Sequence, residues 1–275
     1  PTRFWSFPAR DASITEADAR ETLRTTLDDA VRDHLVSDVP VGVFLSSGLD
    51  STIMAGLAAR HAPGVRCFTV GFADNPDMSE APMASRTAEA FGLEHHDIQV
   101  TGADAEAACR TWLETQDQPS MDGLNVYLVA GAVKREGITV ALSGQGGDEL
   151  FGGYPSFRDA PRLMRAVRAM RWAPAPVRSL AGDLLAARSN ESRRHKLRDA
   201  LATDGSVLEM FFAVRRVIAT RQLAELGVFP GDLGLTRSFM PPEALEGVAW
   251  DDSDTSWHLS QLESRYYMGN MLLHD

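Results

Sequence analysis

The segment Val39–Thr52, which reads VPVGVFLSSGLDST, decides the fold. Its first half is a continuous apolar run, typical of a strand buried on both faces of a parallel sheet. Small polar residues follow, and Leu49–Arg60 then carries apolar residues at helical spacing. A strand, a tight turn and a helix in this order predict that Leu45–Thr52 lies at the carboxyl edge of a parallel sheet, where such sheets bind ligands.

Strands and helices continue to alternate on both sides of this segment. Upstream, Thr15 and Asp18 have the spacing of a capping box for a helix over Glu16–Val36. Downstream, the patterns predict strands at Arg66–Val70, His95–Val100 and Ile138–Leu142 and helices at Ser79–Phe91, Asp104–Glu114 and Asn125–Lys134. Alternation at close intervals predicts an α/β fold with right-handed βαβ units and a doubly wound parallel sheet.

The strand signal stops after Tyr154. Arg-, Ala- and Leu-rich stretches interrupted by prolines follow, and they predict an added helical subdomain. We therefore predict a linker over residues 1–14, an α/β core over residues 15–155 and a helical subdomain over residues 156–275. Because the sequence starts at Pro1 rather than at Met, we expect a processed chain or one cut from a longer protein.

The composition is that of an ordinary globular protein, with 44% hydrophobic and 24% charged residues. The formal net charge of −11 argues against general nucleic-acid binding. No apolar run approaches the roughly 20 residues of a membrane span. Two cysteines without clustered partners indicate a reducing, cytoplasmic setting. The basic stretch Arg162–Arg198 fits a solvated helix face or a contact with a partner or nucleotide.

The turn Leu45–Thr52 has the chemistry of a phosphate-binding loop. The helix that follows offers free N–H groups and partial positive charge to an anion, and Ser46, Ser47 and Ser51 add hydroxyl donors. Gly48 lets the backbone approach a ligand closely. Because a carboxylate repels phosphate, we expect Asp50 to hold a Mg²⁺ ion that bridges phosphates. The alternative is a turn in which Asp50 merely caps the helix.

A second glycine-rich loop follows the last predicted strand. Residues Ala141–Tyr154 read ALSGQGGDELFGGY. Glycines cost chain entropy on folding, and a plain connection has no need of so many. Asp148 and Glu149 fall at the expected start of a short helix, where a carboxylate can meet a second Mg²⁺ coordination position.

These motifs together resemble a known family. LSSGLDS is similar to the S-G-G-x-D-S pyrophosphate loop of ATP pyrophosphatases, with Ser47 in place of the first glycine. Together with SGQGGDELFGGY, it resembles the glutamine-dependent asparagine synthetase family. DQPSMDGLNVYLV at Asp117–Val129 is similar to the substrate-side segment of that family, and FTVGF at Phe68–Phe72 to its adenine-side strand. The resemblance implies an ATP-pyrophosphatase type of α/β fold with a helical subdomain.

The resemblance also implies a reaction. The enzyme would adenylate the side-chain carboxylate of aspartate, release pyrophosphate and pass the acyl group to ammonia, with ATP and Mg²⁺ as cofactors. Ammonia would come from glutamine through a glutaminase domain absent from this sequence, and the full-length enzyme would be a homodimer. We expect the chain on its own to bind nucleotide and to have little activity.

The same resemblance assigns site residues. The implied catalytic residues are Asp50, Gln145, Asp148 and Glu149, of which Asp50 and Asp148 are the metal ligands. The implied ATP and pyrophosphate contacts are Leu45, Ser46, Ser47, Gly48, Asp50, Ser51, Val70, Gly71, Ser143 and Gly144, with backbone near Phe44. The implied substrate contacts are Asp117, Ser120, Asp122, Asn125 and Tyr154.

Gln145 departs from the family pattern, which commonly has an acid at this position. A neutral amide cannot act as a base for ammonia or pair with a substrate ammonium group. Either Glu149 or another residue fills that role, or the substrate is not aspartate. Two alternatives therefore remain open: a β-lactam synthetase-like or peptide-cyclising synthetase that acts on another carboxylate, and a catalytically silent nucleotide-binding module.

Overall fold

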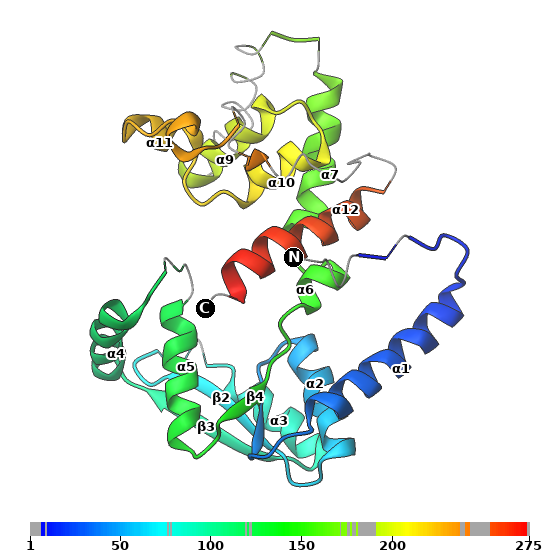
Figure 1. Cartoon of the computed structure of the whole chain (residues 1–275), viewed down its shortest axis with the longest axis vertical. Coiled ribbons are helices and arrows are strands. Elements are labelled where there is room, and N and C mark those ends of the chain that lie inside the picture. The colour runs from blue at the N-terminus through cyan, green and yellow to red at the C-terminus, as the bar shows by residue number, and fades with distance from the viewer. Residues whose placement is uncertain are drawn as a thin grey trace. The chain divides into compact units, whose positions relative to one another are not determined.

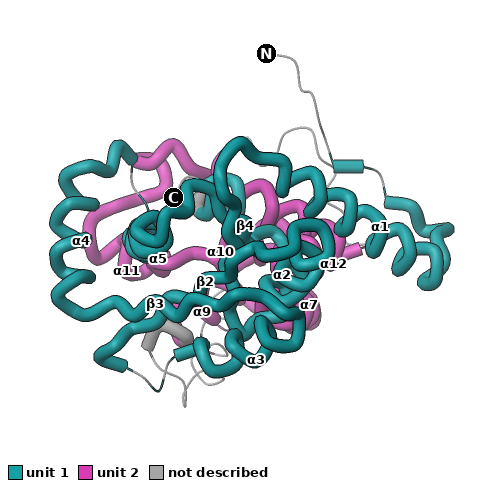
Figure 2. The backbone as a smooth tube through the Cα atoms, turned by 90° about the horizontal axis from the view of Figure 1, so that it is seen from below, with its two compact units in different colours: residues 1–147, 267–275 teal, residues 148–266 magenta. Residues whose placement is uncertain are grey.

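The structure is a computed structural model. It describes residues 7–8, 10–75, 77, 79–118, 120, 123–170, 172–174, 177, 180, 191–236, 240–242 and 254–273, without the side chains of residues 191–193 and 271. The chain divides into two compact units (Figure 2). Unit 1 consists of residues 1–147 and 267–275, and unit 2 of residues 148–266.

Unit 1 is built on a four-stranded parallel sheet with the order β3–β2–β1–β4 (Figure 1). The strands are β1 (Val41–Phe44), β2 (Arg66–Phe72), β3 (Glu94–Val100) and β4 (Val140–Leu142). The chain adds β2 and β3 on one side of β1 and then crosses to add β4 on the other side. The boundary between β1 and β4 is therefore a topological switch point, the place where open parallel sheets bind ligands.

Helices cover both faces of this sheet. They are α1 (Glu16–His34), α2 (Leu49–His61), α3 (Ala81–Phe91), α4 (Gly102–Thr115) and α5 (Gly123–Arg135). Val43 and Cys67 point to one face and pack in a core with residues of α1, α2 and α3. Phe68 points to the other face and packs with Val133 of α5 and with Ile138. The predicted doubly wound α/β architecture is confirmed.

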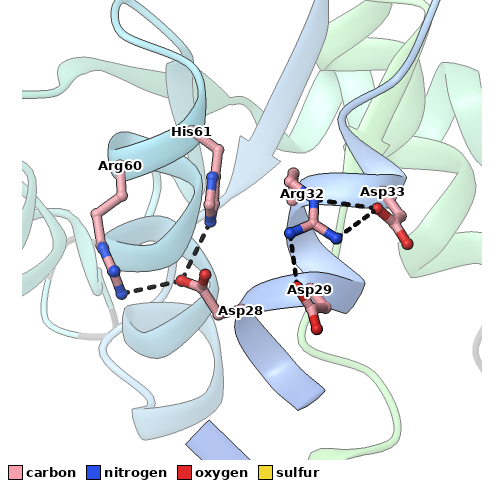
Figure 3. A network of polar contacts seen from close by, with 6 residues as sticks. All are labelled: Asp28, Asp29, Arg32, Asp33, Arg60 and His61. Carbon is pink, nitrogen blue, oxygen red and sulfur yellow. Dashed lines mark hydrogen bonds and ion pairs between the residues drawn. The ribbon is translucent and has the colours of Figure 1, made fainter. Parts of the chain in front are cut away.

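Polar contacts fix the two ends of the α1–α2 pair. Thr15 is the N-cap of α1, and its hydroxyl accepts the Asp18 N–H at 3.2 Å, as the capping pattern predicts. Further along α1, Asp28 Oδ1 lies 3.1 Å from His61 Nε2 and 2.9 Å from Arg60 Nη1 (Figure 3). His61 and, to a lesser degree, Arg60 hold the pKa of Asp28 below its ordinary value. These contacts anchor the end of α2 that lies away from its first turn.

Unit 2 is helical, in agreement with the predicted helical subdomain. Its elements are α7 (Pro155–Ala169), α9 (Glu191–Ala202), α10 (Val207–Arg215), α11 (Thr220–Glu225), the 3₁₀ turn η2 (Pro230–Leu233) and α12 (Thr255–Leu262). Its core packs Met164, Phe211, Leu259 and Leu262 against one another. Within the part of the chain that the structure describes, no helix is long and apolar enough to cross a membrane.

Two elements continue across the division between the units. The short helix α6 (Gly147–Phe151) starts at the end of unit 1, and the π-helical segment η4 (Glu263–Leu272) returns the chain to unit 1. The compact units divide between Gly147 and Asp148, inside the second glycine-rich loop. The domain limits inferred from the sequence, with a boundary after residue 155, stay a prediction.

Candidate functional site

The loop after β1 is braced by its own hydroxyl groups. Ser46 Oγ and Ser51 Oγ lie 2.7 Å apart, and Ser51 Oγ also accepts the Ser46 N–H at 3.1 Å. Ser46 Oγ accepts the Gly48 N–H at 3.1 Å. Sequence reasoning expected both hydroxyls as donors to a phosphate, whereas in the structure they first of all fix the shape of the turn that enters α2.

The N-cap of α2 is Gly48, which makes no side-chain capping bond. The first N–H groups of a helix have no partner within the helix, which makes a helix start of this kind suited to an anion. Ser47, Gly48 and Leu49 are all exposed. Asp50 is half-buried and lies inside the first turn, after the N-cap position. This placement differs from the alternative in which Asp50 caps the helix.

An unexpected residue supports the same loop. Ser47 Oγ donates a hydrogen bond of 3.0 Å to Oε1 of Glu80, which stands at the N-cap of α3. Ser47 is the residue that replaces a glycine of the related pyrophosphate loops, and its side chain thus has a defined partner. Sequence reasoning missed Glu80, because nothing in the local pattern links it to a loop 33 residues away.

The second glycine-rich loop leaves β4 beside the first loop. A Cβ atom added to Gly144 would lie 3.0 Å from Asp50 Cβ and 3.1 Å from the Ser51 nitrogen. One added to Gly147 would overlap the Asp50 carboxylate. Only glycine lets the backbone come so close. The two loops found in the sequence are therefore in direct contact, and glycine backbone lines the Asp50 side chain.

Other residues of the second loop are accessible. Ser143 and Gln145 are both exposed, and the Gln145 N–H donates to Ser143 Oγ at 3.1 Å. Gly144 is half-buried against the first loop. The exposed Gln145 side chain offers two N–H donors and one oxygen acceptor, which suits it to orient a polar substrate and not to transfer a proton.

The end of β1 is held from the side by β2. Thr69 Oγ1 donates to the Leu45 carbonyl at 2.6 Å and lies 2.8 Å from His95 Nε2. Burial lowers the pKa of His95, which favours the neutral ring beside the Thr69 hydroxyl. Val70 and Gly71, the expected adenine-side residues, follow on β2 and are half-buried and buried.

The expected substrate segment precedes α5. Asp117 and Asn125 are exposed, and Ser120 Oγ accepts the Gly123 N–H at 2.6 Å at the start of the helix. Asp122 lies outside the described residues. The structure thus assigns Ser120 a helix-starting contact, while Asp117 and Asn125 are accessible to a ligand.

In unit 2, the remaining expected site residues lie close together. Asp148 is exposed, and its carboxylate lies against Gly153, where an added Cβ atom would overlap it. Glu149 is only 1% exposed and accepts a hydrogen bond of 2.6 Å from the Tyr154 hydroxyl. Glu149 was expected to be catalytic and Tyr154 to bind substrate, whereas in the structure they bond to each other.

The carboxylates of Asp50 and Asp148 suit a divalent cation. Mg²⁺ takes oxygen ligands and is commonly bound by one or two carboxylates together with phosphate oxygens. Asp50 is half-buried and Asp148 is exposed, and the backbone of a glycine lies close against each carboxylate. The oxygen donors of each carboxylate suit Mg²⁺, but no three His, Cys, Asp or Glu side chains of the described residues form a metal-binding group, and the metal assignment stays a prediction.

Comparison with known proteins agrees with the motifs. Residues 22–272 match the protein family described as asparagine synthase. Asparagine synthetase B [glutamine-hydrolyzing] of Escherichia coli is 36% identical over 169 residues, which cover 55% of this chain and 30% of that protein. A putative asparagine synthetase [glutamine-hydrolyzing] of Mycobacterium bovis is 38% identical over 163 residues, covering 59% and 24%. The chain thus spans less than a third of the length of these curated relatives.

Among solved structures, an NH3-dependent NAD synthetase from Campylobacter jejuni, solved in complex with a nitrate ion, is similar at 14% identity and a TM-score of 0.33. The match covers 66% of this chain and 92% of that one. At this level of similarity the match carries no argument about function.

Proposed function

The chain belongs to the asparagine synthase family, and from this premise we propose that it is the synthetase part of an ATP-dependent amide-forming ligase. In this proposal it adenylates the side-chain carboxylate of aspartate and transfers the acyl group to ammonia. A glutaminase domain that supplies ammonia from glutamine, a homodimer of the full-length enzyme and a cytoplasmic location belong to the same proposal.

One observation supports the proposal above all others. Two loops leave the neighbouring strands β1 and β4 at a topological switch point, and the second, which is rich in glycine, packs its backbone directly on Asp50 and Ser51 of the first. Such a site offers helix N–H groups to an anion and a carboxylate to a cation within one turn of backbone. This combination matches a metal–triphosphate ligand better than it matches an uncharged one.

Each part of the site has a role in the proposal. The Ser46–Ser51 loop, with Ser143 and Gly144, binds the pyrophosphate portion of ATP, and Val70 and Gly71 bind the adenine side. Asp50 and Asp148 would hold Mg²⁺, which neutralises charge on the phosphate oxygens when it is bound. Asp117, Ser120, Asp122, Asn125 and Tyr154 form the substrate side.

The proposed reaction has two steps. In the first, a carboxylate oxygen of aspartate forms a bond to the α-phosphorus of ATP while the bond to the β-phosphate oxygen breaks and pyrophosphate leaves. In the second, ammonia adds to the acyl carbon, AMP leaves with the bonding electron pair, and one proton is released. The N–H groups at the start of α2 stabilise the charge that grows on the leaving pyrophosphate.

Gln145 and Glu149 have separate roles in this account. Gln145 is exposed and orients the substrate through hydrogen bonds. Glu149 is buried, so we assign it a positioning role through Tyr154 in place of the catalytic role expected from the sequence.

Amino-acid-dependent exchange between ATP and radiolabelled pyrophosphate tests the proposal with a panel of carboxylates. This assay needs only the adenylation step and no ammonia. We expect aspartate to stimulate exchange above all other carboxylates. Exchange stimulated by a different carboxylate would favour a related synthetase, whereas Mg·ATP binding without any exchange would favour the silent nucleotide-binding module.

A further inference from the structure

Unit 2 contains a polar cluster that connects distant parts of its sequence. Glu263, at the start of η4, is fully buried and accepts hydrogen bonds from Arg215 Nε at 2.7 and 2.9 Å and from Ser156 Oγ at 2.5 Å. Arg215 Nη2 also lies 2.6 Å from Glu263 Oε2. The guanidinium of Arg215 stacks on the ring of Tyr154, 4.1 Å from its centroid.

Tyr154 connects Arg215 and Glu263 to the second glycine-rich loop. Its ring lies under Arg215, while its hydroxyl donates to Glu149 at 2.6 Å. Glu149 directly follows Asp148 in α6. The polar cluster Glu149–Tyr154–Arg215–Glu263–Ser156 is thus continuous from the C-terminal part of unit 2 to the residue next to Asp148.

The turn that carries Asp148 lies between two members of this cluster, Glu149 and Tyr154. The N–H groups of Gly152 and Gly153 both donate to the Asp148 carbonyl at 3.0 Å, and Gly153 lies directly against the Asp148 carboxylate. Tyr154, the next residue, is the N-cap of α7. Tyr154 and Glu149 hold the two ends of this turn, so their placement sets the direction of the Asp148 carboxylate.

A buried ion pair contributes little net free energy to stability. Removing two charges from water costs several kcal/mol per ion, and well-packed apolar residues are often as good or better. Burial raises the pKa of Glu263 even though Arg215 and Ser156 oppose the shift, because the carboxylate is removed from solvent. In contrast, removing a residue that orients a metal ligand without touching the metal typically lowers the metal affinity about 10–100-fold.

The geometry points to Arg215 and Glu263 as positioning residues that hold Asp148, through Tyr154 and Glu149, in the direction needed to bind Mg²⁺. This inference rests on the proposed function, in which Asp148 is a metal ligand. It gives the C-terminal part of unit 2 a defined role in orienting Asp148.

The test compares Glu263→Gln with Asp199→Asn in the full chain. Asp199 pairs with Arg216 at 3.2 Å in the same unit, and the two side chains are 12% and 13% exposed. Asp199→Asn is a matched control, because it also breaks a nearly buried ion pair. This pair lies where α9 and α10 pack together, away from Asp148 in the sequence. Calorimetry gives the apparent affinity for Mg²⁺ in the presence of ATP, and hydrogen exchange gives the protection of the Gly152 and Gly153 amides.

We expect Glu263→Gln to weaken the apparent Mg²⁺ affinity about tenfold or more and to speed exchange of the Gly152 and Gly153 amides. Asp199→Asn should leave both readouts near wild type although it lowers the melting temperature. Unchanged amide exchange in Glu263→Gln overturns the inference, as does an equal loss of Mg²⁺ affinity in both variants.

Asp148→Asn separates this inference from the proposed function. If Asp148→Asn loses Mg²⁺ affinity while Glu263→Gln keeps it, the positioning inference is wrong and the metal assignment holds. If Asp148→Asn keeps Mg²⁺ affinity, the metal assignment in the proposed function is wrong, and with it the purpose assigned to the cluster.

Discussion

Two carboxylates, Asp50 in unit 1 and Glu263 in unit 2, show two ways in which this protein uses an acid. Asp50 is half-buried, and the backbones of Gly144 and Gly147 lie so close to it that an added Cβ atom would crowd or overlap its side chain. Glu263 is fully buried and is satisfied by Arg215 and Ser156. The difference teaches that a half-buried acid packed against glycine backbone stays accessible to a ligand, whereas a fully buried acid bonded to a cation and a hydroxyl holds other residues in place.

The largest effect is expected at the ligand-facing acid. Asp50→Asn should reduce aspartate-dependent pyrophosphate exchange by at least about a hundredfold, because phosphate charge then goes uncompensated. Its free energy of unfolding should stay within about 1 kcal/mol of wild type. Asp29→Asn, a half-buried acid of α1 paired with Arg32 at 2.6 Å, is the control and should keep normal exchange. Near-normal exchange in Asp50→Asn would remove the metal role.

Loss of the structural acid, Glu263, should instead lower the free energy of unfolding strongly. Glu263→Leu leaves Arg215 without its buried partner and should cost about 3–5 kcal/mol in the free energy of unfolding, measured by urea denaturation. The double variant Arg215→Met/Glu263→Leu should recover most of this loss, because it removes both charges. Wild-type stability of the single variant would contradict the structural assignment.

A smaller effect concerns the core beneath the site. Cys67 lies on β2 with no exposed surface, and burial raises the pKa of its thiol to about 11. The thiol is therefore protonated and shielded at pH 8, so we expect iodoacetamide to modify Cys109 and to spare Cys67 until the protein is unfolded. Mass spectrometry of the two peptides measures this directly. Equal labelling of both cysteines in the native protein would show that this core opens readily.

The smallest effect is expected at the far end of α2. The pKa of Asp28 is lowered in the folded protein, first by His61 and then by Arg60. A carboxyl group of this kind contributes stability above its unfolded pKa of about 4, and the contribution is lost as the pH falls through the folded pKa. Asp28→Asn should therefore melt slightly below wild type at pH 7, with a smaller difference at pH 3. A difference that grows toward pH 3 would contradict the sign of this shift.

The sequence predicted the parts of the site that local patterns encode. The apolar run before Ser46 predicted a buried strand, and the glycines after Ala141 predicted more than a plain connection; in the structure Gly144 and Gly147 approach Asp50 closely. Both signals arise within a few residues of the feature that they describe. The pairing of β1 with β4 then brings the two loops together.

The polar contacts between distant residues could not be predicted. Thr69 reaches the Leu45 carbonyl 24 residues away, and Ser156 reaches Glu263 107 residues away. A single serine, threonine or glutamate carries no periodic signal, and its partner depends on how whole elements pack. For the same reason the burial of Glu149 was missed, since its place beside Asp148 in the motif resembles that of an exposed ligand.

The binding of Mg·ATP to Gly147→Ala, set against Gly131→Ala, tests the central claim most directly. A Cβ atom at position 147 would overlap the Asp50 carboxylate, whereas one at position 131, in α5, would have open space around it. An alanine at position 147 must push the Asp50 carboxylate aside, and loss of support for a metal ligand typically weakens metal affinity about 10–100-fold. We therefore expect calorimetry to show a loss of this size for Gly147→Ala and wild-type affinity for Gly131→Ala. Tight Mg·ATP binding by Gly147→Ala would contradict the claim that the loops after β1 and β4 form one nucleotide site around Asp50.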